Sequence, residues 1–223
     1  SVTVRIQSVT DVTATTASAS ASVASQGDIA VERAGVVYGT SSSVSLENGT
    51  VMDAEVTSGK FTLTLEKLES LKKYYVKAFA VATDGNTYYS DKTLSFITPG
   101  EDGISDLSVG GTANSYIVYP VKGTYVFDLV KGNSNESVGE VSSVEVLWET
   151  YNNLTDVVQG TIVESASVEN GKAKFEIPEG AVSGNALLAA KDADGNVLWS
   201  WHIWVADYDP EMTQQTYASG AIM

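Results

Sequence analysis

The chain has 223 residues, 28 of them acidic and 13 basic, which gives a formal net charge of −15. A field of this sign repels nucleic acid and anionic membrane surfaces, so we expect neither as a partner. The absence of cysteine excludes disulfides, thiolate metal sites and a cysteine nucleophile. No apolar run approaches the roughly 20 residues of a membrane-spanning helix, so we expect no such segment in this chain.

Apolar and polar residues alternate through the first half of the chain, with turn residues between the runs. This period of two is typical of β-strands. The helix-forming residues of LEKLESLKK (65–73) join two such runs, and we interpret them as a strand end and a turn. The runs lie at residues 1–7, 16–25, 29–39, 60–68, 73–82 and 87–98.

The alternation stops at PGEDGIS (99–105), where Pro, two Gly and two acidic residues indicate a linker. Strand patterns then resume at 113–120, 123–130, 141–150, 157–168, 172–178, 185–192 and 197–207. Many short strands at this spacing favour β-sandwiches. We therefore predict an all-β protein of two tandem antiparallel β-sandwich domains: residues 1–98, a linker at 99–105, and residues 106–223.

Residues 8–98 resemble a fibronectin type III domain. Leu68 precedes Tyr74 by six residues, and Tyr74 opens the alternating YYVKAFA (74–80). The resemblance implies an immunoglobulin-like sandwich in which Tyr74 is a corner tyrosine, with its hydroxyl bonded back to the preceding turn. Alternation in this strand separates an inward set, Val76, Ala78 and Ala80, from an outward set, Tyr75, Lys77 and Phe79.

The second half resembles a module of Bacteroidales cell-surface and fimbria-associated lipoproteins. The resemblance is carried by GTANSYIV (111–118), GTYVFDLVKGN (123–133), and GNALLAAKDADGNVLWSWHIWV (184–205). It implies a location at the outer membrane surface and a lipid anchor outside this chain. It also implies that the chain is a fragment, because in this family the stretch that closes here at Met223 runs on further.

The strand at 197–207 contains three of the four tryptophans and the only histidine. Trp199 and Trp201 share a wholly apolar face with Ile203 and Val205, as a sandwich interior requires. Trp204 lies on the mixed opposite face. We therefore predict structural roles for Tyr74, Trp148, Trp199 and Trp201, and propose Trp204, Tyr208 and Tyr217 as binding candidates.

We find no catalytic or metal site in the sequence. Ser200 is on the face of His202, but two residues along a strand are about 6–7 Å apart, too far for a nucleophile and its base. KDADGNV (191–197) lacks the Gly and Glu that an EF-hand calcium loop requires at its sixth and twelfth places, counted from Asp192. It is typical of a hairpin turn in which Gly195 adopts positive φ. We therefore predict no catalytic residue, metal or cofactor.

These observations favour a non-enzymatic bacterial cell-surface protein with a structural, adhesive or fimbria-associated role. Two alternatives stay open: a carbohydrate-binding surface lipoprotein, and the non-catalytic domains of a larger glycan-degrading enzyme. The partners we expect are a surface glycan or another surface or fimbrial protein.

Overall fold

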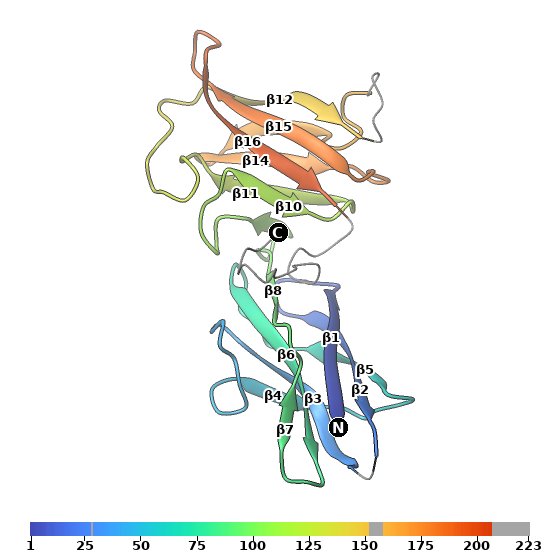
Figure 1. Ribbon diagram of the computed structural model, residues 1–223. Helices are drawn as coiled ribbons and strands as arrows, with labels where there is room; N and C mark the ends of the chain where they lie inside the picture. Colours follow the sequence, from blue (N-terminus) through green and yellow to red (C-terminus); the bar gives the residue numbers. More distant parts are fainter. Residues whose placement is uncertain (28, 152–157, 207–223) are drawn as a thin grey trace, which may run out of the picture. The chain divides into compact units, whose positions relative to one another are not determined.

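The structure is a computed structural model that describes residues 1–27, 29–151 and 158–206. Within these ranges the chain forms sixteen β-strands and no helix (Figure 1). It divides into two compact units, one comprising Ser1–Pro99 and the other beginning at Gly100. The all-β sandwich fold is confirmed.

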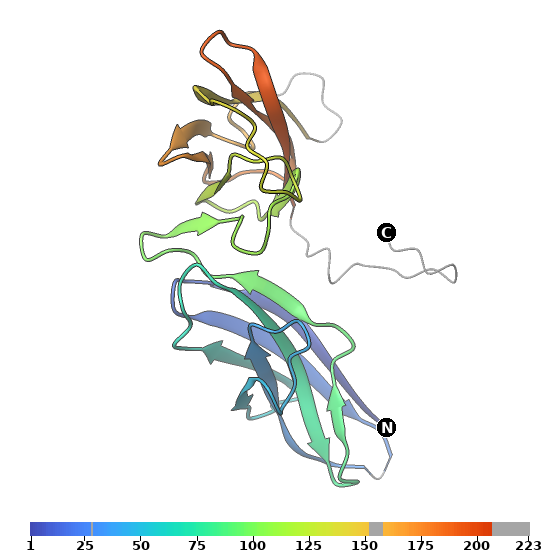
Figure 2. The same ribbon diagram turned by 90° about the vertical axis from the view of Figure 1, so that its left-hand side faces the viewer.

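Unit 1 is a sandwich of two sheets, whose strands can be followed by colour in Figure 2. One sheet has the order β1–β2–β5, and in the other β4, β3, β6 and β7 are neighbours while β8 also pairs with β6. All these pairs are antiparallel. The strands are β1 (Val2–Thr10), β2 (Ala17–Ser25), β3 (Val31–Gly39), β4 (Thr50–Asp53), β5 (Lys60–Leu65), β6 (Lys73–Ala82), β7 (Thr87–Tyr89) and β8 (Leu94–Ile97).

Strict alternation builds the core of unit 1. In β2 the alanines Ala17, Ala19 and Ala21 are buried, while the serines between them are only partly covered. Small side chains on this strand let larger ones such as Leu65 and Phe96 fill the space between the sheets. The inward set of β6, Val76, Ala78 and Ala80, lies in this core as predicted.

Phe79 corrects the expectation that the outward set of β6 faces solvent. It does lie on the face opposite the core, but it is fully buried in a second cluster with Val37 and Val44. Val44 belongs to the segment between β3 and β4, and the Arg33 guanidinium lies 5.2 Å from the centre of the Phe79 ring. The loop therefore covers a side chain that strand alternation alone assigns to water.

Unit 2 is a second sandwich, with sheets in the orders β10–β16–β15–β12 and β13–β14–β11–β9. Two pairs, β10 with β16 and β9 with β11, are parallel, and the others are antiparallel. The linker predicted at 99–105 overlaps the start of β9. The strands are β9 (Ile104–Asp106), β10 (Ser115–Val118), β11 (Gly123–Asp128), β12 (Ser143–Thr150), β13 (Ser165–Glu169), β14 (Lys172–Ile177), β15 (Gly184–Lys191) and β16 (Val197–Val205).

Aromatic rings fill the interior of unit 2. Trp201 of β16 meets Phe127 of β11 edge to face, with ring centroids 5.0 Å apart, and Phe127 lies 6.2 Å from Phe175. All three side chains are fully buried. The indole N–H of Trp201 donates to the Val130 carbonyl at 3.2 Å, so its one polar group is satisfied in the core.

A lysine joins three strands of the second sheet in unit 2. Lys172 of β14 forms ion pairs with Asp106 of β9, at 2.9 Å, and with Asp128 of β11. Burial acts to lower the pKa of Lys172, but the two carboxylates outweigh it and raise this pKa above its ordinary value. The short parallel strand β9 is therefore held by a side-chain contact as well as by its ladder.

Candidate functional site: an aromatic sheet face

One face of the sheet β10–β16–β15–β12 points away from the core of unit 2, and we call it the outer face. The register of the strands sets its side chains in cross-strand rows. Exposed large apolar side chains gather on two of these rows. The first row is Ile117, Trp204, Asn185 and Thr150, and the second is Ser115, His202, Leu187 and Trp148.

Trp148 reaches the outer face because of a β-bulge. The register between β12 and β15 shifts between Val146 and Trp148, so that Leu147 and Trp148 together oppose Leu187. Val146 packs against the core, whereas Trp148 is 45% exposed. The tryptophan to which we assigned a structural role thus lies on the surface, because the inserted residue reverses the parity of the strand.

Glu149 fixes the end of β12 directly after the bulge. Its carboxylate accepts hydrogen bonds from the backbone N–H groups of Gly160, Ile162 and Val163, at 2.7, 3.0 and 2.6 Å. A charged acceptor with three such donors makes strong hydrogen bonds. The backbone that carries Trp148 is therefore anchored, and the segment 160–163 is shaped by a side chain instead of by a strand ladder.

His202 is held between two polar neighbours on the outer face. Its Nε2 lies 2.7 Å from the Asn185 amide oxygen, and its Nδ1 lies 3.4 Å from the Ser115 hydroxyl. An amide oxygen only accepts, so Nε2 carries the proton and Nδ1 is the acceptor in the neutral ring. The Trp148 and His202 ring centroids are 6.4 Å apart, and Leu187 lies between the two residues in the row.

This arrangement does not supply nucleophilic catalysis. The hydroxyl near His202 is that of Ser115, not Ser200, and a 3.4 Å contact is long for an activating hydrogen bond. The second neighbour is the uncharged amide of Asn185. The backbone N–H of His202 is engaged with the Asn114 carbonyl at 2.9 Å, so it offers no oxyanion donor. The contacts hold the imidazole in place and do not activate a serine.

These two rows of the outer face contain no Asp, Glu, Lys or Arg. The next row brings in Glu145, which pairs with Lys191 at 2.5 Å. The lysine lowers the pKa of the Glu145 carboxyl, with a smaller effect from Ser143. In a chain with a net charge of −15, the described residues of these rows form a locally neutral surface.

The three tryptophans of β16 lie on different faces of the sheet. Trp201 is fully buried, and Trp199 is half-buried against the same core, with its indole N–H bonded to the Asn114 side-chain oxygen at 3.0 Å. Trp204 is 38% exposed on the outer face. Tyr208 and Tyr217, the other two binding candidates, lie outside the described residues.

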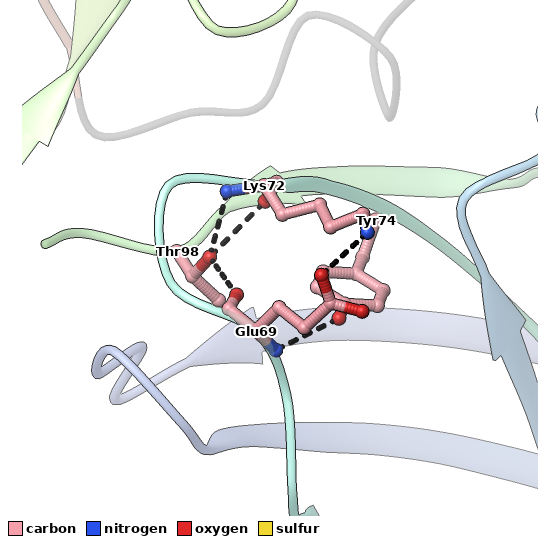
Figure 3. A network of polar contacts seen from close by, with 4 residues as sticks. All are labelled: Glu69, Lys72, Tyr74 and Thr98. Carbon is pink, nitrogen blue, oxygen red and sulfur yellow. Dashed lines mark hydrogen bonds and ion pairs between the residues drawn. The ribbon is translucent and has the colours of Figure 1, made fainter.

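Tyr74 sits at a corner of unit 1, as Figure 3 shows. Its hydroxyl accepts a hydrogen bond from the backbone N–H of Glu69 at 2.9 Å, which is the contact that the fibronectin resemblance implies. The buried hydroxyl of Thr98 donates to the Glu69 carbonyl at 2.6 Å and accepts from the Lys72 N–H at 3.0 Å. This network binds the turn before β6 to the residue after β8.

The segment 192–196 forms a hairpin turn. Asp192 Oδ1 accepts from the backbone N–H groups of Asp194 and Asn196, at 3.0 and 2.8 Å, and Gly195 has φ of 83°. The Asn196 side chain also donates to the Asp192 carboxylate, at 3.0 Å. This side-chain hydrogen bond has the largest effect, and together with the backbone hydrogen bonds it lowers the pKa of Asp192. No group of three or more His, Asp or Glu side chains able to hold a metal occurs in residues 1–27, 29–151 and 158–206.

No protein-family model and no curated protein matches the chain. Among solved structures, the sensor domain of an anti-sigma factor from Pseudobacteroides cellulosolvens is 17% identical, with a TM-score of 0.34, and the match covers 45% of this chain and 76% of that one. A human fibronectin type III domain is 19% identical with a TM-score of 0.32, covering 43% and 81%.

A chimeric titin Z1Z2 protein covers 93% of this chain and 97% of its own, at 15% identity and a TM-score of 0.27. At such scores the fold assignment depends on the sheets of the chain itself. In the part of the chain that the structure describes, no helix has the length and apolar character to cross a membrane.

Proposed function

We propose that the chain belongs to a non-catalytic bacterial cell-surface protein that attaches to a partner through unit 2, with unit 1 as a spacer. The observation that carries the proposal is the outer face, where Trp148 and Trp204 are exposed on an uncharged sheet surface. Exposed apolar patches of a few hundred Å² on a folded domain are often functional. The sheet is also a rigid support for binding residues, because Glu149 anchors the end of β12 and a hydrogen bond joins His202 to Asn185.

The cell-surface part of the proposal is supported by the sequence resemblance to Bacteroidales surface and fimbria-associated lipoproteins. An acidic, cysteine-free chain of two sandwiches suits an adhesive or fimbria-associated role, in which one domain holds another away from its anchor. A carbohydrate-binding surface protein is the second candidate, and it is favoured by the polar groups of Asn185 and Ser115 beside the exposed rings.

Two measurements test the proposal. Protease treatment of intact producing cells removes a surface protein, whereas protection until lysis would contradict the location. Beads coated with the chain then report attachment to bacterial envelopes. We expect Trp148→Ala to reduce attachment and Val121→Ala, a change at an exposed site off the outer face, to leave it unaltered. Equal attachment by both variants would contradict the role of the outer face.

A further inference from the structure

The ligand of the outer face can be inferred from its chemistry, on the basis of the function proposed above. Its exposed rings are indoles, whose negative faces attract polarised C–H groups. The polar groups of its two rows are an amide, two hydroxyls and an imidazole. We propose that this face binds a neutral oligosaccharide, with sugar rings stacked on Trp148 and Trp204 and sugar hydroxyls bonded to Asn185 and Ser115.

Charge complementarity favours a neutral ligand. An anionic glycan or peptide would meet the net charge of −15 with no Lys or Arg in the rows of Trp204 and Trp148 to receive it. A cationic ligand would find no carboxylate there and would lose hydration without a partner. Among the described residues of this face, the carboxylate of the next row, that of Glu145, is already paired with Lys191.

The size of the patch argues against a protein partner. Full burial of an aromatic side chain removes about 150–250 Å² from water, so two half-exposed indoles and two aliphatic neighbours offer on the order of 300 Å². A stable protein–protein interface needs about 800 Å² on each partner. Only about 56–58% of such an interface is non-polar, and the apolar area of this patch is smaller than that share. The patch therefore favours stacked sugar rings over a second copy of this chain.

His202 prepares Asn185 for this role. Because Nε2–H of His202 donates to the Asn185 amide oxygen at 2.7 Å, the orientation of the amide is set, and its N–H groups are directed elsewhere. Asn185 is half-exposed and Ser115 is exposed, so both groups reach the surface. Asn185 and Ser115 are thus the hydrogen-bonding groups of the site, and His202 is a positioning residue.

The spacing of the rings indicates more than one sugar. Trp204 and Trp148 lie on strands separated by β15 and in neighbouring rows, so they are two inter-strand steps apart across the sheet and two residues apart along it, about 11–12 Å in all. That span exceeds the width of a monosaccharide. A hexasaccharide should therefore bind much more tightly than the monosaccharide of the same sugar.

Calorimetry and tryptophan fluorescence on the whole chain test the proposal with cellohexaose, xylohexaose and mannohexaose, and with a galacturonate hexamer as the charged probe. We expect at least one neutral hexasaccharide to bind and the charged one not to bind. Trp148→Ala and Trp204→Ala should each weaken binding at least tenfold, Trp148→Phe less, and Val121→Ala not at all. Each of these variants should still melt in a cooperative transition, which shows that it is folded at the temperature of the binding measurement.

Three results would overturn the proposal: no neutral hexasaccharide binds at millimolar concentration, the charged hexamer binds as well as the neutral ones, or both tryptophan variants bind like Val121→Ala. The wider function is judged separately. If Trp148→Ala abolishes attachment to envelopes while no saccharide binds, the outer face has a different partner and only the present inference fails.

Discussion

Trp148 and Trp201 are the same residue type in the same sheet, and their surroundings differ completely. Trp201 is fully buried against Phe127, with its indole N–H bonded to a carbonyl. Trp148 is 45% exposed beside His202. The free energy that each contributes to folding should follow this burial, because cavities cost most where the surroundings are closed.

We therefore predict that Trp201→Ala lowers the free energy of unfolding of unit 2 by about 3–5 kcal/mol. Trp148→Ala should lower it less, by about 1–2 kcal/mol, because only about half of the side chain is buried. Trp199→Ala should fall between them, since Trp199 is half-buried. Denaturant unfolding measures all three values. A loss for Trp148→Ala equal to that for Trp201→Ala would place Trp148 in the core.

The hydroxyl of Tyr74 makes a hydrogen bond that its ring does not need. We predict that Tyr74→Phe preserves the fold of unit 1 and lowers its stability by about 1–3 kcal/mol, since the Glu69 N–H loses its acceptor in a partly buried contact. Tyr75→Phe is the matched control, because Tyr75 lies next in sequence on the opposite face. Identical melting of the two variants would show that the corner bond contributes nothing.

At the scale of the strands, alternation in the sequence is sufficient to place most elements, because a period of two matches a sheet with one buried face. Alternation does not reveal the irregularities, such as β-bulges, that interrupt this period of two. The bulge at Leu147 moves Trp148 to the outer face, and the strand predicted at 157–168 is shortened to β13, which begins at Ser165. Glu149 holds residues 160–163 by side-chain contacts, which leave no mark in the pattern of alternation.

The candidate site was only partly predictable for the same reason. The location of Trp204 on the outer face could be predicted, because alternation places it on the other side of the strand from Trp199 and Trp201. The rest of the site comes from β10, β12 and β15, and its assembly depends on register. The parallel direction of β10 brings Ser115 to His202, and a hydrophobic pattern reads the same in either direction.

Lys172 couples strand pairing in unit 2 to pH. Its pKa is raised in the folded protein, so the protonated form is favoured there. The contribution to stability is therefore complete below the ordinary lysine pKa and is lost as pH rises through the raised value. We predict that the difference in melting temperature between the unsubstituted chain and Lys172→Met shrinks between about pH 7 and about pH 11.

The control for this pH series is Lys122→Met, a change at an exposed lysine. Its difference from the unsubstituted chain should be small at both pH values. If the Lys172→Met difference is constant across the range, the ion pairs with Asp106 and Asp128 do not stabilise the fold through charge.

For the whole molecule, the central prediction concerns independence of the two units. Each has its own core, and the chain passes from one to the other at Pro99 and Gly100. We predict that residues 1–99 and 100–223, produced separately, each melt in one cooperative transition. Calorimetry of the two pieces and of the whole chain measures this. Loss of cooperative melting in both pieces would mean that the chain folds as a single domain.

The position of β16 between β10 and β15 affects how the protein folds while it is being synthesised. Every strand of unit 1 precedes Thr98, so its two sheets can close while the ribosome is still adding the rest of the chain. In unit 2, β10 can pair in its sheet only after β16 has been synthesised. The contact between Phe127 and Trp201 also requires β16. The second unit is therefore incompletely folded until Val205 has emerged, and a chaperone would meet it in that state during this interval.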